Sequence, residues 1–167
     1  MTVWWLGMRQ LVKIATSCVL LACSRQSGNE TTAVPLSQLT AVELRAVPTE
    51  AALDMPLQAA VYAWRDYLPT VGDTTRAHAL SVSVQVRGGV VSPKVLVCDG
   101  IYLVARDSVF RAPPAEQRAG DGPGAVECIL RGGPEWAVGD TLAVVVSVSA
   151  GAQRTMIRRE TTIDATF

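Results

Sequence analysis

The segment from Leu80 to Arg87 reads LSVSVQVR, and its apolar and polar residues alternate without interruption. Successive side chains of a β-strand point to opposite faces of the sheet. The alternation therefore places Leu80, Val82, Val84 and Val86 on one face and polar residues on the other. This pattern is typical of an antiparallel sheet with one buried face, so the sequence predicts such a sheet.

Further segments have the character of strands. Thr141 to Ser149 (TLAVVVSVS) places Leu142, Val144, Val146 and Val148 inward, and Ala150-Gly151-Ala152 turns the chain into Gln153 to Ile163. These two segments are predicted to form a closing hairpin. A hairpin is also predicted for Lys94 to Cys98 and Ile101 to Ala105, because an Asp-Gly pair between apolar runs is a strong turn signal. Ala125 to Arg131 and Ala41 to Val47 are expected to be strands.

The segment Pro56 to Leu68 (PLQAAVYAWRDYL) fits two structures. At helical spacing, one face carries Leu53, Leu57, Val61, Trp64 and Leu68, and its alanines favour a helix. At a spacing of two, one face carries Leu57, Ala59, Val61 and Ala63, opposite Gln58, Ala60, Tyr62 and Trp64. The surrounding strands favour the second interpretation, since this segment can then pair with residues 80–87.

Six or seven strands separated by turn signals predict a mainly β fold, an antiparallel immunoglobulin-like β-sandwich of about seven strands, with a helix near residues 56–68 as the one open alternative. The segment Trp136 to Asp140 (WAVGD) comes directly before a valine-rich strand. This arrangement resembles many bacterial immunoglobulin-like modules over roughly residues 80–165. The resemblance implies an architecture but no activity.

The N-terminal region has the order of segments of an export signal. Arg9 and Lys13 precede the short apolar run Ile14 to Ala22, which ends in Leu20-Leu21-Ala22-Cys23. The run is too short to span a bilayer. It resembles the signal peptide of bacterial lipoproteins, and LLAC resembles their lipobox. The resemblance implies a signal peptide at residues 1–22, a lipid on Cys23, and a protein held on a membrane of the bacterial cell envelope, facing the periplasm or the cell surface.

The mature chain then divides into two parts. Residues 23–35 are polar and are expected to be a flexible tether, and residues 36–167 are expected to form one β-sandwich domain. Cys18 leaves with the signal peptide, so Cys98 and Cys128 remain as the only pair in an oxidising compartment and are predicted to form a disulfide. A two-cysteine metal site would need further ligands, and His78 is the only histidine. No metal site is therefore predicted.

The balance of charged residues and the sequence motifs narrow the range of possible functions. The chain has 15 basic and 15 acidic residues, and removal of Arg9 and Lys13 with the signal peptide leaves 13 basic residues. Nucleic-acid binding is not expected, because it needs a clustered basic face. His78 lies in a polar linking segment without a nucleophile motif, so it is expected to be a solvated loop residue. The sequence predicts no catalytic residue and no cofactor, and the protein is expected not to be an enzyme.

Two hypotheses about function remain. The first is a lipid-anchored binding or structural module that contacts an envelope protein or a glycan. Its contact surface is either the loop predicted for residues 107–124 or a set of aromatic residues on one outer face. The aromatic set is Tyr62, Trp64, Tyr67, Tyr102 and Trp136. Within this set, Trp64 and Trp136 are expected in the core. The second is an envelope hydrolase, which requires two carboxylates to converge among Asp66, Asp99, Glu127 and Glu135.

Overall fold

The structure, a computed structural model, describes residues 39–67, 79–88 and 95–167. The predicted signal peptide at 1–22, the tether at 23–35, the lipidation site Cys23 and the loop residue His78 lie outside the described residues. None of the described helices is both long enough and apolar enough to cross a membrane.

The described residues form one short helix and nine strands. In chain order they are α1 (Ala41–Ala46), β1 (Ala51–Ala52), β2 (Pro56–Asp66), β3 (Leu80–Arg87), β4 (Val97–Ala105), β5 (Ser108–Ala112), β6 (Glu116–Ala119), β7 (Val126–Gly133), β8 (Thr141–Ala150) and β9 (Gln153–Thr166).

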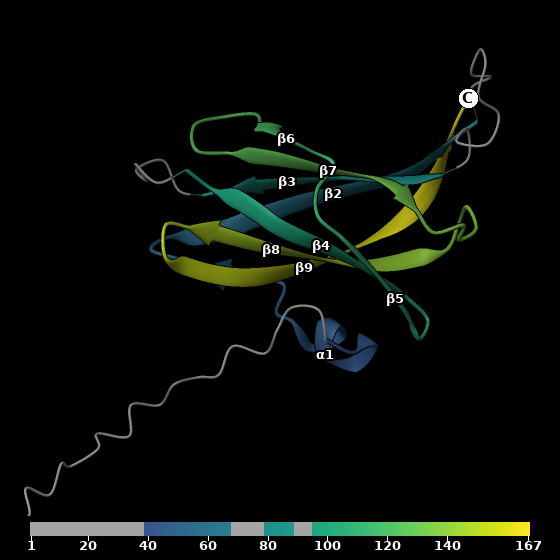
Figure 1. Cartoon of the computed structure of the whole chain (residues 1–167), viewed down its shortest axis with the longest axis horizontal. Helices are drawn as coiled ribbons and strands as arrows, with labels where there is room; N and C mark the ends of the chain where they lie inside the picture. The colour runs from purple at the N-terminus through teal and green to yellow at the C-terminus, as the bar shows by residue number, and fades with distance from the viewer. Residues whose placement is uncertain (1–38, 68–78, 89–94) are drawn as a thin grey trace, which may run out of the picture. The chain divides into compact units, whose positions relative to one another are not determined.

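The strands lie in two layers that β9 joins. One layer has the order β2-β3-β7-β6 and the other β5-β4-β8-β9, which Figure 1 shows as the upper and lower groups of ribbons. The first part of β9 pairs with β8 antiparallel, and its end, Ile163 to Thr166, pairs with β2 in parallel. β9 thus passes from one layer to the other. The prediction of a purely antiparallel sandwich is wrong at this one pair.

The order of the strands is that of an immunoglobulin domain. Such domains place strands A, B, E and D in one sheet and C, F and G in the other, with C′ beside C in the variable type. Here β2, β3, β7 and β6 take the places of A, B, E and D, and β5, β4, β8 and β9 those of C′, C, F and G. The predicted mainly β, immunoglobulin-like sandwich is confirmed, with more strands than the seven expected.

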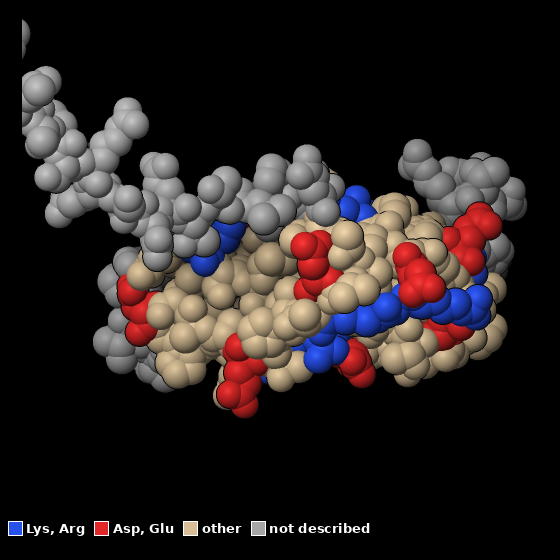
Figure 2. Space-filling view, turned by 90° about the horizontal axis from the view of Figure 1, so that it is seen from below, with Lys and Arg blue, Asp and Glu red and all other residues tan. Residues whose placement is uncertain are grey.

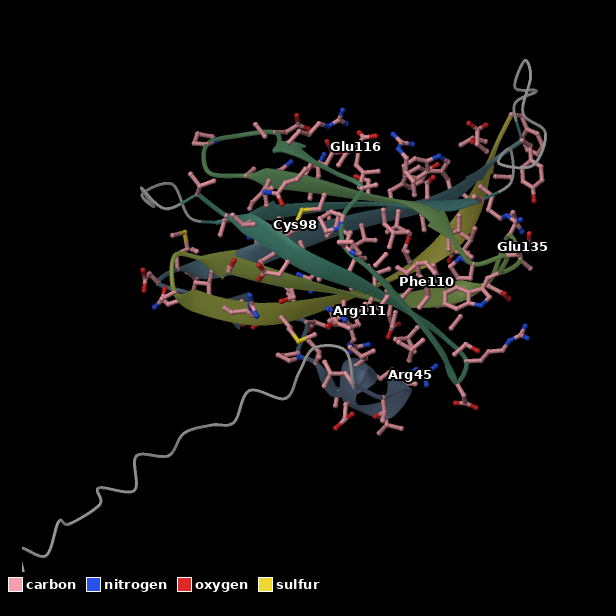
Figure 3. The ribbon with its side chains drawn as sticks, viewed as in Figure 1. Arg45, Cys98, Phe110, Arg111, Glu116 and Glu135 are labelled. Carbon is pink, nitrogen blue, oxygen red and sulfur yellow. A yellow bond between two sulfur atoms is a disulfide. The ribbon has the colours of Figure 1, made fainter. Side chains whose placement is uncertain are left out.

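The core fills the space between the two layers. Its members include the inward residues of β3 and β8, among them Val82, Val84, Val144 and Val146, all at most 1% exposed. Cys98 of β4 and Cys128 of β7 are bonded across the layers, with their Cα atoms 6.4 Å apart, and Figure 3 shows Cys98 between the two groups of strands. The predicted disulfide is confirmed.

Several predicted strands are also confirmed. Residues 56–66 form β2, which pairs antiparallel with β3. The interpretation of this segment as a strand is therefore confirmed, and the alternative helix near 56–68 is wrong for the described part. Ala125 to Arg131 lies largely within β7, and the closing hairpin is the pair of β8 and β9.

The strand predicted at Ala41 to Val47 is wrong, because this segment forms the helix α1. The Thr40 hydroxyl accepts a hydrogen bond from the Glu43 backbone N–H, and the Glu43 carboxylate accepts one from the Thr40 N–H at 2.8 Å. This capping box satisfies donors that would otherwise be unpaired at the start of a helix. Leu44, fully buried, then packs on Tyr102 and Val145 at the outer face of the β4-β8 layer.

The hairpin predicted around Asp99-Gly100 is also wrong. β4 continues through both residues, and its register against β8 shifts between Cys98 and Gly100. Pairing with β8 on both sides of Asp99, Cys98 with Val148 and Gly100 with Ser147, keeps this segment extended, and the Asp-Gly pair marks a bulge instead of a turn. The chain reverses at Arg106 and Asp107, where Arg106 has a φ of 51°, and leads into β5.

The long loop predicted for residues 107–124 is wrong as well. It contains two edge strands: β5 pairs with β4, and β6 pairs with β7. Pro113 and Pro114 lie between them, where the chain crosses from one layer to the other. Phe110 of β5 packs against the main core, which a loose loop would not provide. This segment is therefore part of the sandwich and does not form a separate contact loop.

Candidate functional site

The outer face of β2 carries an exposed aromatic pair. The odd-numbered residues of β2 face the core, so Tyr62 and Trp64 project from the opposite face. Their rings stack with centroids 5.3 Å apart and planes 18° apart. Tyr62 is 46% exposed, and Trp64 is half-buried. Aromatic area that remains exposed on an outer face is available for contact with another molecule.

Polar side chains continue this face across the sheet. The register aligns Ala60 of β2 with Gln85 of β3, Glu127 of β7 and Arg118 of β6. Arg118 Nε donates to one Glu127 carboxylate oxygen at 2.7 Å, and the Ser83 hydroxyl donates to the other at 2.7 Å. Both hydrogen bonds lower the pKa of the Glu127 carboxyl group, and the bond from Arg118 has the larger effect. Ser83 and Glu127 are therefore held in a defined position beside Gln85.

Two hollows follow β2 and β3 along this face. The first, of about 230 Å³, is lined by Ala60, Val61, Tyr62, Ser83 and Gln85. The second, of about 220 Å³, is lined by Pro56, Gln58, Arg87 and Gly88. Gln58 and Ala60 are neighbours on the outer face of β2, so the two hollows lie one after the other.

A larger hollow, of about 670 Å³, lies on the β9 side of β2. There the Arg159 side chain of β9 donates to the backbone carbonyls of Ala59, at 2.9 Å, and of Thr49. Glu50, Leu57 and Gln58 also line this hollow. These two hydrogen bonds hold the Arg159 side chain between β2 and the segment before β1. The position of Arg159 is therefore explained by a structural role, which is to close this edge of the sandwich.

The outer face of the β4-β8 layer is partly covered. Leu44 of α1 packs there over Tyr102, which is 1% exposed. Burial raises the pKa of the Tyr102 phenol, and the nearby positive charge of Arg111 lowers it by a smaller amount. Figure 2 looks onto the side where α1 lies and shows basic side chains next to acidic ones. The ion pairs of this region include Arg45 with Asp107, Arg106 with Asp140, and Arg158 with Glu160.

The aromatic residues singled out from the sequence do not form one platform. Tyr62 and Trp64 share a face, whereas Tyr102 lies under α1. Trp136 packs against the main core, as expected, but the prediction of a core position is wrong for Trp64, which stacks on Tyr62 outside it. Tyr67 stacks on Phe167.

The carboxylates required for a hydrolase have separate surroundings. Asp99 accepts from Ser149 at 3.1 Å and from Arg154 at 3.0 Å, on the β4-β8-β9 layer. Glu127 is paired with Arg118 on the other layer. Asp66 ends β2, and Glu135 follows β7 (Figure 3). Among residues 39–67, 79–88 and 95–167, no three His, Cys, Asp or Glu side chains gather as a metal site would require.

Sequence reasoning missed the hollow beside Tyr62, although part of its signal was present. The spacing of two places Ala60, Tyr62 and Trp64 on one face, and a small residue next to two large ones leaves space. The contribution of Gln85 and Ser83 depends on the pairing of β2 with β3, which is not a local property.

Comparison with known proteins adds no further constraint on this face. No known family, no curated protein sequence and no solved structure gives a significant match to the chain.

Proposed function

We propose that the protein is a lipid-anchored component of the bacterial cell envelope whose immunoglobulin-like domain is a binding module. The observation that carries the proposal is the exposed Tyr62–Trp64 stack with the two hollows beside it. Exposed aromatic area next to oriented polar groups is typical of recognition surfaces. The outer face of the β2-β3-β7-β6 layer, called the β2 face below, is the proposed contact surface.

The proposed anchor rests on the N-terminal sequence. LLAC at residues 20–23 resembles a lipobox, and a tether at residues 23–35 would separate the domain from the membrane. The Cys98–Cys128 bond agrees with this placement, because structural disulfides persist in oxidising compartments outside the cytosol.

Replacing Cys23 by alanine is expected to release the protein from membranes, because the proposed attachment depends on that thiol. The measurements are fractionation of cells that produce the variant and the intact mass of the purified protein. The wild type is expected in the membrane fraction with the added mass of acyl chains. Cys18→Ala is the matched control and is expected to behave as the wild type. Membrane association of Cys23→Ala at wild-type level would contradict the proposal.

The hydrolase hypothesis has less support. A general acid needs a raised pKa, so that it holds its proton near neutral pH. The pKa of Glu127 is lowered by Arg118, which is the opposite effect. The oxygens of Asp99 are engaged by Ser149 and Arg154. We therefore favour binding over hydrolysis.

Photo-crosslinking in living cells tests the binding module. We expect benzoylphenylalanine at Gln58, which lines the second hollow of the β2 face next to the first, to form covalent adducts with an envelope component. The same group at Val42, which is 76% exposed on α1, is the control and is expected to give none. Adducts are read as mass shifts on denaturing gels and by mass spectrometry. No adduct at Gln58, or equal adducts at both positions, would overturn the choice of this face.

A further inference from the structure

We propose that the hollow beside Tyr62 binds one pyranose ring of an oligosaccharide, with the apolar face of the sugar against the tyrosine ring. This inference rests on the binding function proposed above and identifies the chemical class of its ligand. It is carried by four features of the β2 face: the aromatic stack, the small residue next to it, the polar groups at the side, and the pairing of the strands.

The aromatic stack ends at Ala60. Residues two apart on a strand project from the same face about 6.6 Å apart, so Trp64, Tyr62 and Ala60 form a row. One face of the Tyr62 ring is stacked on Trp64, and the hollow that Tyr62 shares with Ala60 lies beyond it. A third ring would occupy this position if residue 60 were aromatic. A ligand ring placed over Ala60, with one apolar face against Tyr62, therefore continues the stack.

The size of the hollow suits one ring. Its volume of about 230 Å³ is below the roughly 300–1,000 Å³ typical of pockets that enclose drug-sized ligands. The second hollow, beside Gln58 and Arg87, follows directly along the strands and has a similar volume. Two such hollows in line fit adjoining units of a linear oligomer better than a single compact molecule.

The polar groups at the side match the hydroxyls of a sugar. The Ser83 hydroxyl donates its proton to Glu127, so its oxygen is left to accept a hydrogen bond. Gln85 accepts from Arg87 at 3.4 Å through its amide oxygen, which leaves the amide N–H groups to donate. A pyranose ring carries hydroxyls, each a donor and an acceptor, around an apolar face. The hollow offers one aromatic wall together with one acceptor and one donor.

The pairing of the strands disfavours an extended peptide as the ligand. A peptide that adds to a sheet needs the free backbone groups of an edge strand. β3 is paired with β2 on one side and with β7 on the other, so its backbone groups are engaged. A ligand on this face is recognised by side chains, and Tyr62 is the aromatic residue among those that line the hollow.

The test uses the full-length protein in detergent and a panel of hexasaccharides made of glucose, N-acetylglucosamine or mannose, with binding measured by isothermal titration calorimetry. We expect the wild type to bind at least one of them. Tyr62→Leu and Ala60→Phe are expected to weaken that binding at least tenfold, because the first removes the aromatic wall and the second fills the hollow. Tyr62→Phe keeps the ring and is expected to stay within threefold of the wild type. Val42→Phe on α1 is the control for an added aromatic ring.

The outcomes separate this inference from the binding function. If no hexasaccharide binds the wild type while benzoylphenylalanine at Gln58 still gives adducts, the sugar ligand is wrong and the binding module stands. If Gln58 gives no adducts and no sugar binds, both are wrong. Wild-type affinity in Ala60→Phe or Tyr62→Leu, with folding verified by circular dichroism, would also overturn the proposed position of the ring.

Discussion

Replacing Val84 by aspartate is expected to prevent the domain from folding. Val84 is fully buried in β3, paired with Val61 on one side and with the bonded residue Cys128 on the other. The change removes the burial of a valine, worth about 1.5–3 kcal/mol, and places a carboxylate between the layers at a cost of several kcal/mol. Because domains are stable by only about 5–15 kcal/mol, the sum approaches the whole stability.

Circular dichroism and urea unfolding measure this effect. The wild type is expected to show a cooperative transition and Val84→Asp none. Val95→Asp is the matched control: the same substitution at a side chain that is 78% exposed should change the free energy of unfolding by no more than about 0.5 kcal/mol. A cooperative transition of Val84→Asp near that of the wild type would contradict the position of β3 in the core.

Removing the disulfide is expected to lower the free energy of unfolding by about 3–4 kcal/mol. Cys98 and Cys128 are 30 residues apart in the sequence, and their bond joins β4 of one layer to β7 of the other. The bond restricts the unfolded chain, and a loop of this length gives that magnitude in the chain-entropy account. The effect exceeds that of a typical surface substitution several-fold.

Urea unfolding with and without reductant measures the contribution of the bond. The wild type is expected to lose stability when reductant is added, whereas the double variant Cys98→Ala/Cys128→Ala is expected to be equally unstable in both conditions. Alkylation of the folded protein without reductant should leave both thiols unlabelled. A change below about 1 kcal/mol on reduction of the wild type would show that the layers are held without the bond.

Much of the sandwich could be predicted from local patterns. The alternation at 80–87 and at 141–149 identified strands and their inward faces, since alternation follows directly from the geometry of a strand. The errors arose where one local signal competed with another. Ala41 to Ala46 alternates, yet the capping box of Thr40 and Glu43 and the packing of Leu44 favour a helix. Asp99-Gly100 resembles a turn, but pairing with β8 keeps it in a strand.

The candidate site could be predicted only in part. Tyr62 and Trp64 were identified as aromatic residues of one strand face, but Trp64 was expected in the core because large apolar residues are usually buried. The polar side of the hollow comes from Ser83 and Gln85, which are about twenty residues away in the sequence. Their position beside Ala60 depends on the register of β2 against β3.

The sequence by itself determined several of the core strands, which of their side chains face inward and which cysteines are able to pair. These properties depend on residues that are close together in the chain, or on the number of partners available. Only the tertiary structure decided the order of the strands, the transfer of β9 between the layers, and which outer face is exposed. Both layers carry aromatic residues outside, but α1 covers Tyr102 and leaves Tyr62 open. Exposure of a face depends on what packs against it from elsewhere in the chain, and no local pattern contains that information.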